Sequence, residues 1–325
     1  MAHERRPLGP NGGPEPVRLS LRGTRVVALG PDEVVLKRGL AEVRLSFPGV
    51  VALVERVTDL ADGTLDEDSI VEAFEPDLQP QVRRLVNGIR ARGLLHRLPT
   101  ADPTDLFWLS VAPFAPDGAA ILDKSHVVVL GSGAVAESAA AALSASGVGE
   151  VVASDVPPVS GDADIWCLAA DDVLDVTNDL LPAAEAALRA GVACLPVWLE
   201  ALAVRVGPMT HPYDTACLQC YLLRVDSNDP ERELHRQFRA QRGDGHSGAG
   251  FLPPTASVAG QVAAVEIVKQ LAGLPVASIG RVIELSLIPF RCDVRRVLRV
   301  PRCPLCSGVG AQGAPVVAHA SQLAE

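Results

Sequence analysis

The sequence lacks the features that would direct it to a membrane or to nucleic acid. No run of 18 or more apolar residues occurs in its 325 residues, so no membrane-spanning helix is expected. The first residues are charged and then rich in proline and glycine, without the apolar core of a signal peptide. The formal net charge of -10 disfavours a general nucleic-acid partner, which requires a cationic surface. We therefore expect a cytoplasmic protein with no membrane association.

Lysine is also scarce. The chain contains only three lysines, Lys37, Lys124 and Lys269, and it has no arginine between residues 98 and 188. Phosphoryl-transfer sites depend on cationic side chains to stabilise the charge of the transition state. A phosphate site formed by residues 125–188 would therefore receive no cation from that whole stretch.

A glycine turn between two apolar runs is the most distinctive part of the chain. The run 126–130 precedes Gly131, Gly133 and Ala136, an alanine-rich segment follows, and the next apolar run ends at Asp155. This pattern is typical of a mononucleotide-binding βαβ unit, in which the first glycine permits the turn and the second admits a pyrophosphate. The small third residue allows close helix packing, and the acid would hold a ribose hydroxyl. Such turns also serve only as packing devices, so both interpretations stay open.

Strands and helices continue to alternate after this unit. The pattern predicts strands at 165–169 and 192–197, helices at 181–190 and 257–271, a polar crossover loop at 226–250, and a closing antiparallel pair at 281–287 and 292–300. Alternation of this kind implies a parallel sheet covered on both faces. The predicted fold class is therefore α/β, with a Rossmann-like, mostly parallel sheet domain at residues 125–310.

Four of the seven cysteines form two C-x-x-C pairs, Cys217 with Cys220 and Cys303 with Cys306. Two such pairs match the ligand set of tetrahedral zinc, and with four protein ligands the site would be closed and structural. Two disulfides or two redox pairs are the alternatives. A redox C-x-x-C usually caps a helix in a thioredoxin-like context, which neither pair shows.

The first third of the chain predicts a separate small module. Residues 1–16 are rich in proline and glycine and are expected to form a disordered arm. Residues 17–98 contain three short β-branched runs and then three segments of helical periodicity, with a turn at 62–64. This order is typical of a winged-helix-like module. A linker of mixed strand and turn is expected at 99–124, and a loose tail at 311–325.

Charge is divided unevenly within this module. Residues 55–77 are rich in acids, whereas residues 78–98 carry five arginines and no acid. A cationic third helix suits a short acidic peptide better than duplex DNA, and the strand 41–47 could accept that peptide by β-augmentation. The predicted contacts are Arg44, Leu45 and Ser46 on the strand and Arg83, Arg84, Asn87 and Arg90 on the helix. The alternative is that these arginines are simply solvated.

The ordered set of glycine turn, acid, C-x-x-C, crossover segment, helix and second C-x-x-C resembles the superfamily of ubiquitin-activating-like and ThiF-type adenylating enzymes. Residues 17–98 resemble the recognition element that binds leader peptides in the biosynthesis of ribosomal peptide natural products (RiPPs). Together they resemble the leader-binding partner proteins of azoline-forming YcaO cyclodehydratases, which occur in thiazole/oxazole-modified microcin and thiopeptide pathways. The resemblance covers nearly the whole chain.

The sequence departs from the active adenylating enzymes around the glycine turn. Asp155 is followed by Val-Pro-Pro instead of a segment containing Asn, Arg and Gln, and the phosphate-holding lysine is missing. Asp171 or Asp172 could correspond to a magnesium-binding acid, but an acid without cationic partners would repel phosphate. No cysteine lies between Cys220 and Cys292 to form a thioester. We therefore expect a catalytically inactive domain with a vestigial nucleotide site that does not take ATP.

The resemblance implies a binding and presenting role. The protein would bind the leader of a precursor peptide and present it to a YcaO-type, ATP-dependent cyclodehydratase that forms azolines from Cys, Ser or Thr, either as a homodimer or in a hetero-complex. One alternative is an active ATP-dependent adenylating enzyme acting on a peptide or carrier-protein terminus. Others are a nicotinamide dehydrogenase, for which no catalytic set accompanies the turn, and a winged-helix transcription factor, which the acidic charge disfavours.

Overall fold

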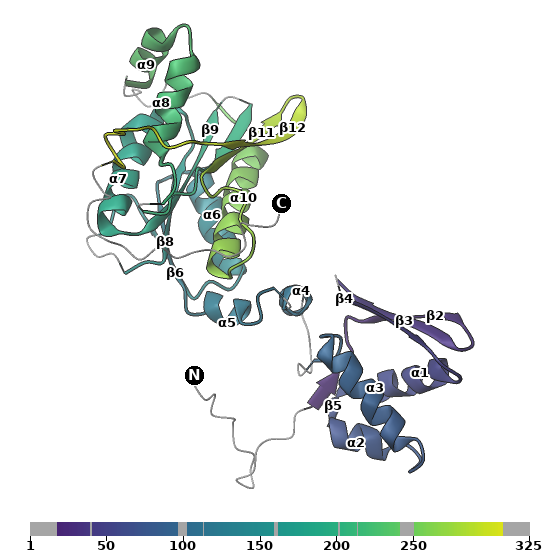
Figure 1. Cartoon of the computed structure of the whole chain (residues 1–325). Helices are drawn as coiled ribbons and strands as arrows, with labels where there is room; N and C mark the ends of the chain where they lie inside the picture. Colours follow the sequence, from purple (N-terminus) through teal and green to yellow (C-terminus); the bar gives the residue numbers. More distant parts are fainter. Residues whose placement is uncertain are drawn as a thin grey trace. The chain divides into compact units, whose positions relative to one another are not determined.

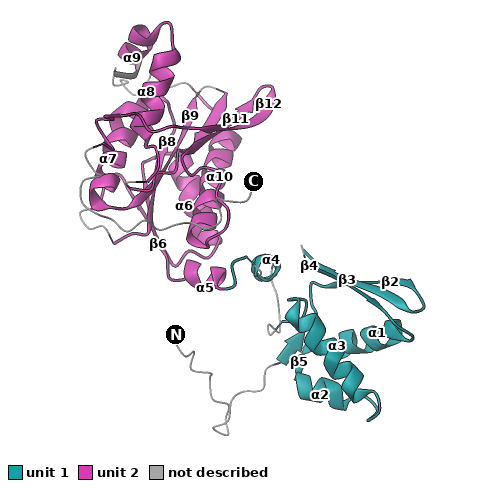
Figure 2. Cartoon of the chain, in the orientation of Figure 1, with its two compact units in different colours: residues 1–116 teal, residues 117–325 magenta. Residues whose placement is uncertain are grey.

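The chain divides into two compact units, residues 1–116 and 117–325 (Figures 1 and 2). The computed structural model describes residues 18–39, 41–96, 103–112, 114–158, 162–200, 202–212, 214–240 and 250–307. The arm predicted at 1–16 and the tail predicted at 311–325 lie outside the described residues.

Unit 1 combines a three-stranded sheet with helices (Figure 1). β2 (Arg25–Gly30), β3 (Glu33–Arg38) and β4 (Ala41–Ser46) pair antiparallel in the order β2-β3-β4, and α1 (Val50–Leu60), α2 (Glu67–Glu72) and α3 (Gln79–Ala91) follow. The predicted succession of three strands and three helices is therefore present. The turn predicted at 62–64 is wrong, because this segment belongs to β5 (Asp62–Asp66), which pairs with β1 (Arg18–Ser20).

The hydrophobic core of unit 1 comes from the apolar faces of its helices. α1 buries Val50, Leu53, Val54 and Val57, and α3 buries Val82, Leu85, Val86 and Ile89. These residues recur every three or four positions, so they lie on one helical face and form one cluster with the buried side of the sheet. Burial of each such side chain contributes about 1.5–3 kcal/mol, which explains why the periodicity located both helices.

Unit 2 is built on a seven-stranded sheet with the strand order β12-β11-β10-β9-β8-β6-β7. Its parallel part consists of β6 (His126–Leu130), β7 (Glu150–Ser154), β8 (Ile165–Ala170) and β9 (Ala193–Glu200). β10 (Ala203–Val206), β11 (Arg281–Leu287) and β12 (Phe290–Arg296) extend it by antiparallel pairing. The predicted α/β class and the closing antiparallel pair are confirmed. β10 was not predicted, because a strand of only four residues shows too short a pattern in the sequence.

Helices cover both faces of this sheet (Figure 1). α6 (Ala134–Ala145) and α10 (Pro253–Leu271) pack together on one face. The π-helix η1 (Val176–Leu180), α7 (Leu181–Ala190) and α8 (Leu218–Asn228) cover the other, where they enclose Trp166 and Trp198 of the sheet. α6 and α10 approach so closely that a Cβ on Gly260 would lie 2.6 Å from the backbone nitrogen of Ala139.

Two segments predicted to be irregular contain helices. α4 (Pro103–Val111) and α5 (Gly118–Leu122) lie within the predicted linker 99–124, and α9 (Arg232–Ala240) lies within the predicted loop 226–250. α9 is rich in charged residues, so it shows no apolar periodicity in the sequence. Arg236 Nη1 lies 3.2 Å from Glu233 Oε2 one turn earlier, and this ion pair stabilises the helix. Among the described helices, none has the length and apolar character that a membrane span requires.

Replacing Gly260 with alanine should destabilise unit 2, although alanine favours helices. The added methyl would lie 2.6 Å from both the Ala139 nitrogen and Ser138 Cβ, so α10 would have to move away from α6. Overpacking of this kind costs about 1–3 kcal/mol. Gly88 provides a control inside α3, because its Cβ would meet only Arg92 Nη1, at 3.8 Å. Gly88→Ala should therefore stabilise unit 1 by about 0.5–1 kcal/mol. Urea unfolding measures both, and a stabilising Gly260→Ala would contradict the close contact.

Candidate functional site

Four buried cysteine sulfurs converge in unit 2 from two segments far apart in the sequence. Cys217 precedes α8 and Cys220 lies in its first turn, whereas Cys303 and Cys306 follow β12. The sulfur–sulfur distances are 3.8 Å for Cys217–Cys220, 3.7 Å for Cys217–Cys303 and 3.6 Å for Cys220–Cys306. A tetrahedral zinc ion, with Zn–S bonds of about 2.3 Å, places its sulfurs about 3.8 Å apart. The predicted four-cysteine cluster is confirmed, and its geometry can hold a metal ion such as zinc.

One argument against redox chemistry is wrong, because Cys217 of the first C-x-x-C pair is the N-cap residue of α8. The rest of the geometry still fits disulfides or redox pairs less well than a metal site. A disulfide requires a sulfur–sulfur distance of about 2.0 Å, which the 3.8 Å between Cys217 and Cys220 excludes for that pair. All four thiols are buried, so a redox partner could not reach them. Soft thiolate ligands select zinc over hard cations such as magnesium or calcium.

Burial and hydrogen bonds shift the pKa values of the cysteine thiols in the cluster. Burial raises the pKa of the Cys306 thiol to about 11. A hydrogen bond from Cys217 lowers the pKa of Cys220 to about 4, and the backbone N–H of Val300 also donates to the Cys220 sulfur at 3.3 Å. The charge of a bound cation would favour ionisation of the thiols.

The cluster joins α8 to the segment that follows β12. Arg224, one turn beyond Cys220, donates from Nε to the carbonyl oxygen of Leu298 at 2.7 Å and from Nη2 to that of Arg299 at 3.3 Å. Val282 and Val297 pack around the sulfurs. A metal at this position would therefore hold the late segment of the chain against the sheet domain, as the spacing of the pairs predicts.

The glycine turn lies between β6 and α6, against the end of β8. Gly131 and Gly133 have φ values of 128° and 116°, which L side chains rarely adopt. A Cβ on Gly131 would lie 2.1 Å from the carbonyl oxygen of Ala169, and one on Gly133 would lie 2.4 Å from Asp171 Oδ2. Ala136, the small third position, is buried in α6. The turn therefore has the backbone geometry that the sequence pattern predicts.

Asp171 occupies the end of α6 where a phosphate would bind in a nucleotide site. Its Oδ2 and Oδ1 accept hydrogen bonds from the backbone N–H groups of Ala134 and Val135, both at 2.9 Å. Free N–H groups at a helix N-terminus are what phosphate-binding turns offer to an anion. The sequence suggested that Asp171 or Asp172 corresponds to a magnesium-binding acid, and the structure instead shows Asp171 as the internal cap of α6.

More carboxylates surround this turn. Burial raises the pKa of Asp175, and the charges of Asp179, Asp172 and Asp171 raise it further. Asp155, the predicted ribose ligand, is exposed directly after β7. Because no lysine lies between 125 and 268 and no arginine between 98 and 188, this segment supplies no counter-charge. A phosphate bound at this turn would therefore meet the negative charge of Asp171.

The predicted peptide-binding residues lie on two elements of unit 1. Arg44, Leu45 and Ser46 lie on β4, and Arg83, Arg84, Asn87 and Arg90 lie on α3. Leu45 packs against the core, and Arg44 forms an ion pair with Glu33 of the neighbouring strand. Within the described part of unit 1, no hydrogen bond or ion pair joins the β4 group to the α3 group.

The arginines of α3 form ion pairs with acids of α2 within unit 1, which the sequence did not reveal. Arg83 Nη1 lies 2.8 Å from Asp68, and Arg90 Nη1 lies 2.6 Å from Glu67. The acids of α2 and the arginines of α3 therefore neutralise each other in part. Arg84 is exposed and has no ion pair among the described residues, so it is the cation of this group most available to a ligand.

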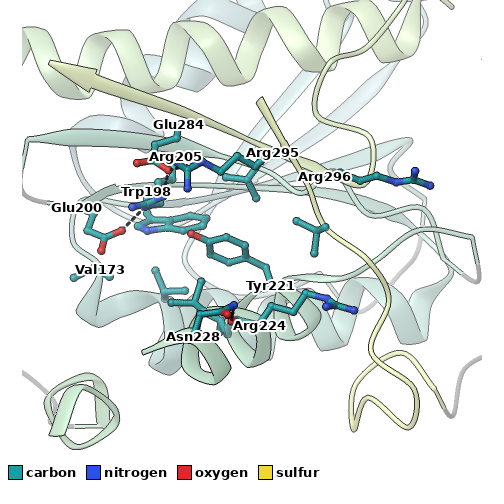
Figure 3. A pocket seen from close by; sticks show the side chains of 15 residues that line it. Val173, Trp198, Glu200, Arg205, Tyr221, Arg224, Asn228, Glu284, Arg295 and Arg296 are labelled. Atoms are coloured by element: carbon teal, nitrogen blue, oxygen red, sulfur yellow. Dashed lines mark hydrogen bonds and ion pairs between the residues drawn. The ribbon is translucent and has the colours of Figure 1, made fainter. Parts of the chain in front are cut away.

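A cavity of about 490 Å³ lies on the α8 face of unit 2, and nothing in the sequence signals it. Its walls come from α8, from β9 to β12 and from the segment after β8, with Trp198, Arg205 and Tyr221 near its centre (Figure 3). These elements are distant in sequence and meet only when the sheet is assembled.

The purified protein should contain about one zinc ion per chain, because four sulfurs stand at zinc-like spacing. Cys220→Ser and Cys303→Ser should each reduce zinc to less than about half an equivalent and lower the melting temperature, since each removes one of the four ligands. Cys292→Ser is the matched control, because Cys292 is exposed and outside the cluster. Elemental analysis measures the metal, and equal zinc in all four proteins would contradict the assignment.

Asp171→Ala should lower the free energy of unfolding of unit 2 by about 1–2 kcal/mol, because it leaves two N–H groups of α6 without their acceptor. Asp155→Ala, at an exposed position with no hydrogen bond in the described structure, should change it by less than about 0.5 kcal/mol. Urea unfolding compares the two. Equal effects would show that Asp171 does not act as a cap.

The sequence matches no protein-family model and no curated protein sequence. The fold does match solved structures. The heterocyclase TruD superposes with a TM-score of 0.68 and 20% identity over 90% of this chain and 43% of that chain. A heterocyclase in complex with substrate and cofactor gives a TM-score of 0.67 and 20% identity over 89% of this chain and 39% of that chain. This chain thus spans less than half the length of these heterocyclases.

A second group of similar structures is MccB from E. coli. The MccB structure with succinimide has a TM-score of 0.55 and 15% identity, and the match covers 89% of this chain and 99% of that chain. At these identities the likeness concerns the fold alone. Nearly the whole chain therefore shares its fold with one part of a heterocyclase and with all of MccB.

Proposed function

We propose that unit 1 binds the leader peptide of a ribosomally made precursor, and that the chain presents this precursor to a YcaO-type cyclodehydratase, which forms azolines from Cys, Ser or Thr. The observation that carries the proposal is the shared fold over 90% of this chain with the heterocyclase TruD. Another heterocyclase that shares this fold is known in complex with its substrate and cofactor.

We assign the ATP-dependent cyclisation to the partner enzyme. The match covers only 43% of TruD, and the acids around Asp171 disfavour phosphate binding in this chain. A subunit that holds the leader raises the effective concentration of the core peptide at the active site of the partner. It can therefore increase turnover without taking part in the chemistry.

The leader is proposed to add a strand to β4 in unit 1. In the order β2-β3-β4, β4 is an edge strand, so one side of its backbone offers unpaired N–H and C=O groups. We interpret residues 17–98 as a winged-helix-like recognition module and residues 125–310 as the adenylating-enzyme-like domain. An acidic leader would compete with Glu67 and Asp68 for the arginines of α3, because exposed ion pairs are worth only about 0–1 kcal/mol.

An active adenylating enzyme is the second candidate, favoured by the fold likeness to MccB over 99% of its length and by an MccB structure with ATP. The capping of α6 by Asp171 opposes it. ATP–pyrophosphate exchange by the isolated protein in the presence of a precursor peptide would establish this activity, and its absence would leave the presenting role.

Arg84→Glu should weaken leader binding about fivefold to tenfold, because it reverses an exposed charge on α3 that has no internal partner. Arg83→Glu and Arg90→Glu should also weaken it. Arg25→Glu on β2, at the opposite edge of the sheet, is the matched control for net charge and should leave the affinity unchanged. Fluorescence polarisation with a labelled leader from a precursor encoded beside this protein measures the affinity. Equal losses in all four variants, or no loss in any, would contradict the assignment.

A further inference from the structure

The residues that line the cavity on the α8 face of unit 2 include none from the glycine turn and none of the predicted leader contacts. Its volume of about 490 Å³ lies within the range typical of sites for small organic ligands. Its lining includes four arginines and two glutamates, which give it a formal charge of +2 in a protein whose net charge is -10. The cavity is therefore a cationic site in an anionic molecule.

The acidic groups of the cavity are already paired. Arg205, whose side chain is 17% exposed, bonds to Glu200 and lies 2.8 Å from Glu284 Oε2 (Figure 3). Arg295 Nε lies 3.6 Å from the same oxygen. Both carboxylates thus face arginines within the wall. Arg295 is 62% exposed and retains donors that can reach a ligand.

Two further polar groups at the centre make no hydrogen bond to the described residues. Trp198 is 1% exposed, and its indole N–H has no hydrogen-bond partner in the described structure. The ring centroids of Tyr221 and Trp198 lie 5.8 Å apart (Figure 3). The Tyr221 hydroxyl makes no hydrogen bond to the described residues. The Tyr221 hydroxyl is therefore the polar group at the centre that can bond to a ligand.

The rest of the wall is apolar. Apolar side chains from three parts of unit 2 line the cavity: Val173 and Val176 after β8, Leu222 and Val225 of α8, and Val282 and Val297 from the sheet and its extension. Valine and leucine side chains beside two aromatic rings suit a hydrophobic body. A ligand that satisfies this wall must combine that body with a negatively charged acceptor.

We propose that this cavity binds a carboxylate carried by an apolar or aromatic body. Arg295 and the Tyr221 hydroxyl hold the carboxylate, and the valine-lined wall holds the body next to the Trp198 ring. We favour a carboxylate over a phosphate, because the additional negative charge of a phosphate would lie close to Glu200 and Glu284. The carboxylate belongs either to a free organic acid or to an acidic side chain next to an aromatic residue in a polypeptide.

The test follows the indole N–H resonances of the intact, metal-loaded protein by ¹H–¹⁵N NMR. The chain has three tryptophans, Trp108, Trp166 and Trp198, so Trp198→Phe identifies the relevant signal. The probe is 3-phenylpropionate, and its neutral analogue is 3-phenylpropionamide. We expect a saturable shift of the Trp198 signal with the acid and about tenfold weaker binding of the amide, because a charge-assisted hydrogen bond is lost.

Arg295→Gln should weaken binding of 3-phenylpropionate about tenfold, and Arg291→Gln should not. The two arginines are a matched pair on β12, since both contact Asp293 but only Arg295 lines the cavity. An end-blocked Asp-Phe dipeptide forms the second arm: tighter binding of the dipeptide indicates a polypeptide ligand, and tighter binding of the free acid indicates a small molecule. No saturable shift with either acid, equal binding of the amide, or equal losses in both arginine variants would overturn the proposal.

Discussion

The meeting of the two cysteine pairs determines the structure of the α8 face of unit 2. Along its 11 residues α8 buries only Leu218 and Cys220, and most of β12 is exposed. Hydrophobic burial alone therefore provides little to hold either element in place. Bound structural zinc contributes on the order of 10 kcal/mol to the folding of small metal-binding domains. A metal held by the four sulfurs would cross-link the two segments and so stabilise this wall.

The glycine turn separates two properties that a nucleotide site requires, shape and charge. Gly131 and Gly133 retain the backbone geometry, because any side chain would collide with the end of β8 or with Asp171. The charge is reversed, because the carboxylate of Asp171 accepts from the N–H groups that would face a phosphate. The close packing of α6 on the sheet depends on the first property alone. The turn can therefore be retained for folding when the chemistry is absent.

Local patterns in the sequence predicted the elements that depend on local rules. α3 was predictable because its apolar residues recur at helical spacing, β8 because it is a continuous apolar run, and the cysteine cluster because two C-x-x-C pairs rarely serve another purpose. β10 is too short and α9 too polar to show such a pattern. The ion pair of Arg90 with Glu67 illustrates a deeper limit: a count of charges cannot distinguish an internal partner from an external one. The cavity beside Trp198 has no local signature either, since its walls come from separate strands and helices.

Because Asp171 accepts hydrogen bonds from the two N–H groups at the start of α6, its carboxylate would compete with any anion for this helix end. A tethered group acts at an effective concentration in the millimolar range or higher, and an incoming anion must displace it. If the carboxylate holds the two amides for about 99% of the time, the apparent affinity of any competitor falls about 100-fold. A single side chain can thus silence an anion site while the backbone around it stays unchanged, so the shape of such a turn is a poor guide to whether it is occupied.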